Sequence, residues 1–141
     1  MEIDKSIIIY NNIGGVNHKV SKTLSNKLKI QAFSVSETRL INLEHYNNFI
    51  FVCPNIGDEE IPNEFENFFI NLNINNRFYS LCELGNYFGY EQDYFGCRLI
   101  IEKLLNNLHW KEILNISIDS FPKLDNAMLN KWILKLKEQW I

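Results

Sequence analysis

The feature that most constrains the fold is a regular alternation of short apolar runs with stretches whose apolar residues recur at helical spacing. The first run, Ser6 to Tyr10, contains three consecutive isoleucines. An uninterrupted β-branched run is typical of a strand buried on both faces of a parallel sheet. The stretch from Lys19 to Leu28 follows, with Val20, Leu24 and Leu28 on one helical face. This alternation of strand and helix patterns indicates βαβ units.

The same alternation continues along the whole chain of 141 residues. Right-handed crossovers between parallel strands place helices on both faces of the sheet. The sequence therefore predicts a single doubly wound α/β domain over residues 1–141, with a five-stranded parallel sheet in the order 2-1-3-4-5. The stretch 36–47 follows neither pattern and is expected to be a loop with an irregular turn. The other expected strands lie at 31–35, 48–53, 77–82 and 113–118, and the other expected helices at 64–72, 97–108 and 125–140.

Charge and hydropathy exclude several classes of function. The formal net charge of −3 disfavours binding of nucleic acid through a basic patch. No stretch approaches the roughly 20 apolar residues of a membrane-spanning helix. The segment from Met1 to Tyr10 lacks the basic and apolar regions of a signal peptide. We therefore expect a soluble, cytoplasmic monomer that associates with neither nucleic acid nor membrane.

The three cysteines indicate neither a metal site nor a disulfide framework. Cys53, Cys82 and Cys97 form no C-x-x-C pair and no Cys/His set with metal-ligand spacing. Cys53 and Cys82 end apolar runs, which favours buried free thiols. An odd number of widely spaced cysteines is typical of a reducing compartment.

Three loops leave the carboxyl ends of expected strands, at residues 11–17, 54–62 and 84–96. In an open α/β sheet, ligands bind outside the carboxyl ends of the strands, at the switch point of the strand order. The same three loops are the richest in glycine, asparagine and aromatic residues. This coincidence predicts a binding site at that edge of the sheet.

The first loop combines two glycines with amide side chains between a buried strand and a helix. Glycine lets the backbone approach a phosphate closely, and N–H groups at a helix N-terminus point toward such an anion. The loop has no Lys or Arg, so we expect neutral dipoles to hold the anion, although a glycine pair here is also compatible with an ordinary tight turn. It lacks the G-K-[ST] of a P-loop and the G-x-G-x-x-G of dinucleotide folds. The candidate residues are Asn11, Asn12, Ile13, Gly14, Gly15, Val16 and Asn17.

The third loop contains five aromatic residues. Aromatic side chains in a loop either fold under it or pack on something flat, and a planar heterocycle is a natural partner through offset stacking. We expect Phe95 to anchor the loop to the core and Tyr90 to stack on a ligand.

In order and spacing, the three loops resemble those of the flavodoxins over nearly the whole chain. The stretch Asn12 to Asn17 resembles their T/S-x-T-G-x-T phosphate loop: Gly15 matches, and Asn12, Gly14 and Asn17 replace the hydroxyl residues. The second loop, Pro54-Asn55-Ile56-Gly57, resembles their P-T-aromatic-G loop, with Ile56 in place of the aromatic residue.

The third loop resembles the G-D-x-x-G-Y segment of the same family, as Gly85-Asn86-Tyr87-Phe88-Gly89-Tyr90. Asn86 stands where the family usually has Asp. The stretch Leu84-Gly85-Asn86 is also similar to the L-G-N of the flavodoxin modules of diflavin reductases. The cofactor residues implied by the second and third loops are Pro54, Asn55, Ile56, Gly57, Leu84, Gly85, Asn86, Tyr87 and Tyr90.

The resemblance implies a flavodoxin-like fold and an FMN-binding electron carrier, not an enzyme. It implies that Tyr90 stacks on the outer flavin face, that Ile56 covers the inner face, and that the Gly57 carbonyl accepts a hydrogen bond from the reduced flavin N5. The interval from Leu108 to Phe121 leaves no room for the insertion of long-chain forms. The acidic residues at 58–66 would steer a basic partner such as a ferredoxin/flavodoxin reductase.

Three alternatives remain open from the sequence. One is a flavodoxin-like FMN activator of manganese ribonucleotide reductase, which has a similar short chain and third loop. Another is a degenerate interaction module with the same fold that no longer binds FMN, since fold does not fix function. A response-regulator-like receiver fits less well, because Asn11-Asn12 and Pro54-Asn55 occupy the positions of its acidic residues.

Overall fold

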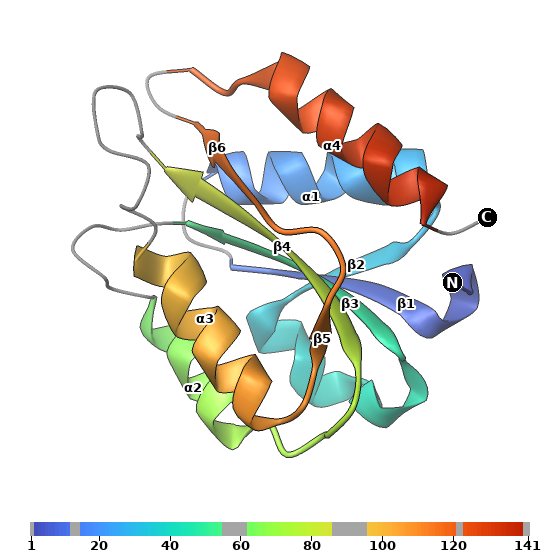
Figure 1. Ribbon diagram of the computed structural model, residues 1–141, viewed down its shortest axis with the longest axis vertical. Helices are drawn as coiled ribbons and strands as arrows, with labels where there is room; N and C mark the ends of the chain where they lie inside the picture. The colour runs from blue at the N-terminus through green and yellow to red at the C-terminus, as the bar shows by residue number, and fades with distance from the viewer. Residues whose placement is uncertain (1, 12–14, 55–61, 86–95, 121–122, 140–141) are drawn as a thin grey trace.

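The computed structural model describes residues 2–11, 15–54, 62–85, 96–120 and 123–139. Its helices and strands follow the predicted alternation and are connected as successive crossovers (Figure 1). The strands are β1 (Ser6–Tyr10), β2 (Gln31–Ser34), β3 (Asn48–Pro54), β4 (Phe78–Gly85), β5 (Lys111–Glu112) and β6 (Ile116–Asp119). The α-helices are α1 (Gly15–Leu28), α2 (Asn63–Asn71), α3 (Gly96–Asn107) and α4 (Asn126–Glu138), and the 3-10 helices are η1 (Ile3–Lys5), η2 (Val35–Leu40) and η3 (Leu43–His45).

The sheet is parallel throughout and has the order β2-β1-β3-β4-β5, which confirms the predicted 2-1-3-4-5 topology. The expected fifth strand at 113–118 is only partly correct: residues 113–115 are not in a strand, and two short strands, β5 before them and β6 after them, take its place. Both β5 and β6 pair with β4, the first through Tyr79 opposite Glu112 and the second through Cys82 opposite Ile116. Two residues of β4 lie between Tyr79 and Cys82, whereas three residues lie between their partners Glu112 and Ile116. The extra residue is a bulge, which interrupts the ladder locally.

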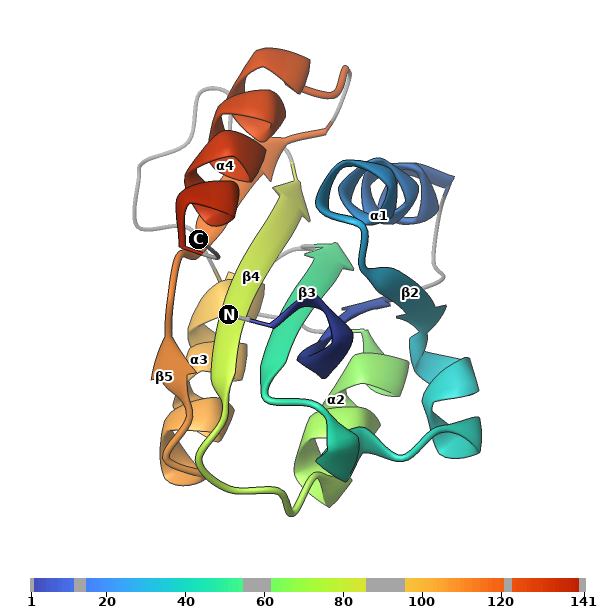
Figure 2. The same cartoon turned by 90° about the vertical axis from the view of Figure 1, so that its right-hand side faces the viewer.

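Alternate residues of the central strands enter two separate hydrophobic cores. Ile7, Ile9 and the Phe49–Phe51 pair pack with α2 and α3 on one face. Ile8 and Ile50, which lie between them in sequence, pack with α1 and α4 on the other face. Figures 1 and 2 show the two helical layers on opposite sides of the sheet. Burial on both faces explains why the strands read as uninterrupted apolar runs.

Three segment boundaries differ from the sequence-based expectation. The stretch expected to be an irregular loop forms the short helices η2 and η3 instead. The backbone N–H of Ser34 donates to Glu37 Oε1 at 2.8 Å at the start of η2, a local capping contact that hydrophobic periodicity does not report. Helix α1 already begins at Gly15, and β4 continues to Gly85. Within the described part of the chain, no helix has the length and apolar character to cross a bilayer.

Candidate functional site

The carboxyl ends of β1, β3 and β4 lie side by side at one edge of the sheet. Tyr10 is opposite Val52, and Pro54 is opposite Leu84, so the three strands end within a few residues of one another. The backbone N–H of Asn11, a fully buried residue, donates to the Val52 carbonyl at 3.1 Å and extends the ladder by one bond. The three predicted binding loops therefore start from adjacent positions, and Figure 1 shows the N-termini of α1 and α3 at the same edge.

Seven of the predicted cofactor residues belong to the described part of the chain. They are Asn11, Gly15, Val16, Asn17, Pro54, Leu84 and Gly85. The other nine, Asn12, Ile13, Gly14, Asn55, Ile56, Gly57, Asn86, Tyr87 and Tyr90, lie outside the described residues. The expectations for stacking by Tyr90, for Phe95 and for the Gly57 carbonyl therefore remain predictions.

The N-terminus of α1 has the properties of an anion-binding end. Its first turn contains no acidic residue, and the first N–H groups of any helix lack intrahelical acceptors. No atom of the described residues lies within 4 Å of the position that a Cβ on Gly15 would occupy. The described residues outside the helix thus leave space beside Gly15, and the helix dipole favours negative charge at this end. These features fit a phosphate held without Lys or Arg.

The residues at the ends of β3 and β4 differ in how far they are buried. Leu84 is almost completely buried and packs in the core that faces α1 and α4. Gly85 is the last residue of β4, opposite Asp119 of β6. Pro54 is half-buried at the end of β3. Of these three, Pro54 is thus the residue with partial access to the surface at this edge.

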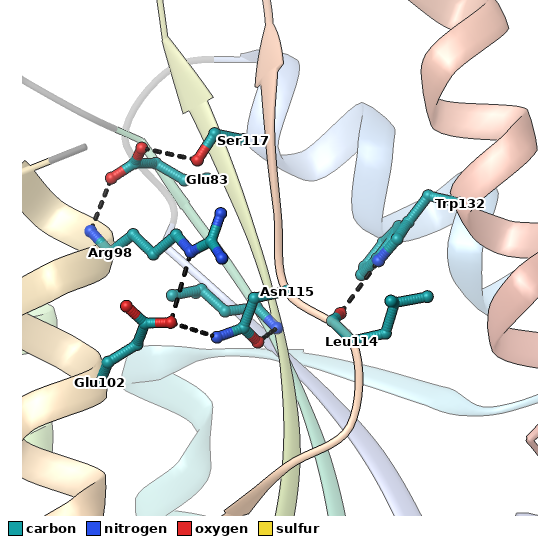
Figure 3. Close-up of polar contacts among 8 residues, drawn as sticks. Glu83, Arg98, Glu102, Leu114, Asn115, Ser117 and Trp132 are labelled. Atoms are coloured by element: carbon teal, nitrogen blue, oxygen red, sulfur yellow. Dashed lines mark hydrogen bonds and ion pairs between the residues drawn. The ribbon is translucent and has the colours of Figure 1, made fainter. Parts of the chain in front are cut away.

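Glu83 is a fully buried carboxylate beside this edge that sequence reasoning did not select. Its Oε2 accepts the backbone N–H of Arg98 at 2.6 Å, and its Oε1 accepts the Ser117 hydroxyl at 3.1 Å (Figure 3). Arg98 lies in the first turn of α3, where a carboxylate accepts from a backbone N–H and complements the helix dipole. Glu83 therefore connects β4, α3 and β6 at the two ends of the chain segment 86–95. A charged residue inside the apolar run of β4 is the sequence signal that marks it.

A second polar chain links α3 to the bulge between β5 and β6. The Arg98 guanidinium pairs with Glu102 at 3.3 Å, and the Asn115 amide donates to the same carboxylate at 2.8 Å (Figure 3). The Asn115 oxygen in turn accepts the backbone N–H of Leu81 at 2.8 Å. Among the described residues, no group of three or more His, Cys, Asp and Glu side chains could hold a metal ion. The hydrogen bonds of Asn115 connect α3, the bulge and β4 at this edge of the sheet.

No protein-family model matches the chain, and no curated protein matches it by sequence. Solved structures do match it over almost its whole length. The flavodoxin of Fusobacterium nucleatum bound to flavin mononucleotide superposes with a TM-score of 0.75 at 14% identity, covering 95% of this chain and 97% of that one. A short-chain flavodoxin associated with a non-canonical PDU bacterial microcompartment gives 0.73 at 16%, with coverages of 95% and 97%. Oxidised flavodoxin 2 of Bacillus cereus gives 0.72 at 17%, with coverages of 96% and 99%.

These similarities establish the fold. Strand order, helical layers and the extent of the superpositions agree, so the chain has a flavodoxin-like fold. Identities of 14–17% show the fold alone, because function depends on the site and not on the fold.

Proposed function

We propose that this protein binds one FMN non-covalently at the carboxyl edge of β1, β3 and β4 and carries electrons between a reductase and acceptor enzymes. The observation that carries the proposal is the convergence of three strand ends with the acid-free N-terminus of α1. Support comes from neighbours of the same fold that are flavodoxins, one of them bound to flavin mononucleotide.

Two groups of residues would bind the two ends of the cofactor, its phosphate and its flavin ring system. The segment Asn11 to Asn17, with the first N–H groups of α1, would hold the phosphate. The segments 54–57 and 84–90 would enclose the ring system, with Tyr90 stacked on one face. When bound, the flavin supplies the capacity to accept and release single electrons, which ordinary side chains lack. The protein's part is to bind, orient and electrostatically tune it.

The partner we propose is a basic redox protein of the ferredoxin/flavodoxin reductase class, docking near residues 58–66. Glu64 and Glu66 lie in the first turn of α2, which follows the carboxyl edge of β3 in the chain. Acidic side chains close to a cofactor edge raise the association rate of a basic partner more than its affinity. The association rate should therefore fall steeply as salt concentration rises.

Binding of FMN by the purified protein is the decisive test. We expect a yellow protein, or a colourless one that quenches the fluorescence of added FMN with a stoichiometry of one. Riboflavin, which lacks the phosphate, should bind at least about tenfold more weakly, since a phosphate at a helix N-terminus is stabilised by dipoles and N–H groups. A protein that takes up neither flavin would contradict the proposal and leave the interaction-module alternative.

A second experiment addresses the stacking assignment. Tyr90→Ala should weaken FMN binding by roughly tenfold, because an aromatic pair contributes about 0.5–1.5 kcal/mol beyond its buried area. Trp132→Phe is the matched aromatic control, since Trp132 packs in the core on α4 and its indole N–H donates to the Leu114 carbonyl (Figure 3). Equal flavin affinities in the two variants would refute the role of Tyr90.

A further inference from the structure

Two cysteines that are 44 residues apart in sequence meet in the core beside the carboxyl edge. Cys53 Sγ lies 2.7 Å from Cys97 Sγ, and both residues are fully buried free thiols. Cys53 is the penultimate residue of β3, and Cys97 is the second residue of α3. The contact therefore joins the end of β3 to the start of α3 within the core that faces α2 and α3.

The third cysteine provides an internal comparison. Cys82 is equally buried, but it packs in the core that faces α1 and α4, whereas Cys53 and Cys97 pack in the core that faces α2 and α3. The sheet itself separates the two groups of thiols. Cys82 is thus as buried as the other two cysteines. Among the described residues, the thiol–thiol contact is the one between Cys53 and Cys97, and Cys82 is not part of it.

We propose that Cys53 and Cys97 are a dithiol pair that a small peroxide converts to an intramolecular disulfide. One thiol sulfur attacks hydrogen peroxide and becomes a sulfenic acid, releasing one water. The sulfur of the second thiol then attacks the sulfenic sulfur, the S–S bond forms, and a second water leaves. Two thiols lose two electrons and two protons in total, and one peroxide is reduced to two waters.

Geometry favours the second step in particular. A sulfenic acid on either cysteine is already in contact with its resolving thiol, so the reaction is intramolecular and proceeds at a high effective concentration. The disulfide bond length of about 2.05 Å requires the sulfurs to approach by well under 1 Å. Burial admits a small neutral oxidant more readily than a bulky disulfide reagent.

Burial also sets the pace of the first step. Desolvation, followed by the contact with Cys97, raises the pKa of the Cys53 thiol well above its ordinary value, and desolvation raises the pKa of Cys82 as well. Because the thiolate is the reactive form, oxidation should be slow compared with that of an exposed cysteine. Once formed, the bond would tie the end of β3 to the start of α3. This cross-link goes beyond the proposed carrier function and does not depend on it.

The test counts thiols on the folded, flavin-free full chain. After treatment with hydrogen peroxide and acid quenching, the protein is unfolded, alkylated without reductant and measured by intact mass. We expect two of the three thiols to disappear together with the loss of two hydrogens, and dithiothreitol to restore both. Peptide mapping should find Cys53 joined to Cys97. Three alkylated thiols after complete reaction, or a link through Cys82, would overturn the proposal.

Matched variants distinguish the effect of the Cys53–Cys97 contact on disulfide formation from the effect of burial alone. Cys82→Ser should still lose both remaining thiols, whereas Cys97→Ser should form no intramolecular disulfide. Cys53→Ala should also form no intramolecular disulfide, and it replaces Cys97→Ser in the test if that variant does not fold. Disulfide-linked dimers in the wild type would contradict an intramolecular bond. None of these measurements uses FMN, so failure of flavin binding and failure of the dithiol proposal are distinguishable.

Discussion

The side chain of Asn115 provides the hydrogen-bond acceptor that a neighbouring strand backbone would otherwise provide for the Leu81 N–H. Its side-chain oxygen accepts the Leu81 N–H at 2.8 Å at the bulge between β5 and β6, where the backbone ladder with β4 is interrupted. Its amide nitrogen donates to Glu102 on α3 at 2.8 Å. A single amide therefore pairs one backbone N–H of β4 and connects this strand to the helix that packs over it. Buried backbone N–H groups are almost always paired, which is why this position needs a side chain with both a donor and an acceptor.

The first prediction follows from that pairing. Asn115→Ala leaves the Leu81 N–H without an acceptor and should reduce the free energy of unfolding by about 1–3 kcal/mol. Urea denaturation followed by circular dichroism measures it. Asn106→Ala, an exposed change on α3, is the control and should stay within about 0.5 kcal/mol of the wild type. Equal stabilities of the two variants would mean that water replaces the Asn115 bond without cost.

A pH-dependent prediction concerns Glu112. Partial desolvation of the carboxyl, and then its hydrogen bond and charge repulsion with Glu102, raise its pKa above the ordinary value of 4.5. Folding thus favours the protonated form, so this contribution to stability is complete below about pH 4.5 and is lost as pH rises through the raised pKa.

Glu112→Gln should therefore be more stable than the wild type at pH 7, and the difference should disappear below pH 4. Glu112 is exposed, so the gain should be no more than a few tenths of a kcal/mol. Thermal unfolding from pH 3 to 8 provides the measurement. Glu138→Gln at the end of α4 is the charge-matched control, and a similar pH profile for it would exclude a specific role of Glu112.

A substitution at Gly15 should change the affinity for the cofactor without reducing the stability of the fold. A methyl group on Gly15 meets no described atom within 4 Å, so Gly15→Ala should leave the fold intact and stabilise the start of α1 slightly. The same methyl group would occupy the space through which a phosphate approaches the helix. We expect FMN affinity to fall by about tenfold while riboflavin affinity, measured by fluorescence quenching, stays the same. Equal loss for both ligands would place the phosphate elsewhere.

The periodicity of the sequence predicted the layers and the strand order because it records which residues are buried. Ile7 to Ile9 read as a two-sided strand for that reason, and the core confirms it. The division of β5 from β6 escaped prediction, because one inserted residue changes hydrogen bonding without changing the apolar pattern of the segment.

Contacts distant in sequence escaped prediction for a different reason. The pairing of Cys53 with Cys97, and of Glu83 with the N-terminus of α3, depends on how crossovers place one strand end against a helix start. Spacing along the chain holds no information about such distances. The converging strand ends could be predicted, since the topology alone brings them together.

Glu83 allows the most direct measurement of how the sheet edge is held. Glu83→Ala removes the acceptor of the Arg98 N–H and opens a cavity in a fully buried place, so the loss of stability should exceed about 3 kcal/mol. Glu83→Gln keeps the shape and one acceptor oxygen but loses the charge, and should cost less, about 1–2 kcal/mol, because charge-assisted bonds are roughly twice as strong as neutral ones.

Amide hydrogen exchange distinguishes a local anchor from general destabilisation. In the wild type the Arg98 N–H, held at 2.6 Å by the carboxylate, should be strongly protected although it lies in the first turn of α3. Glu83→Gln should increase its exchange rate relative to other slow amides of β4. Ser117→Ala removes the hydroxyl partner alone and should leave Arg98 protected. If exchange at Arg98 follows only the global stability in all three variants, the carboxylate does not anchor the start of α3.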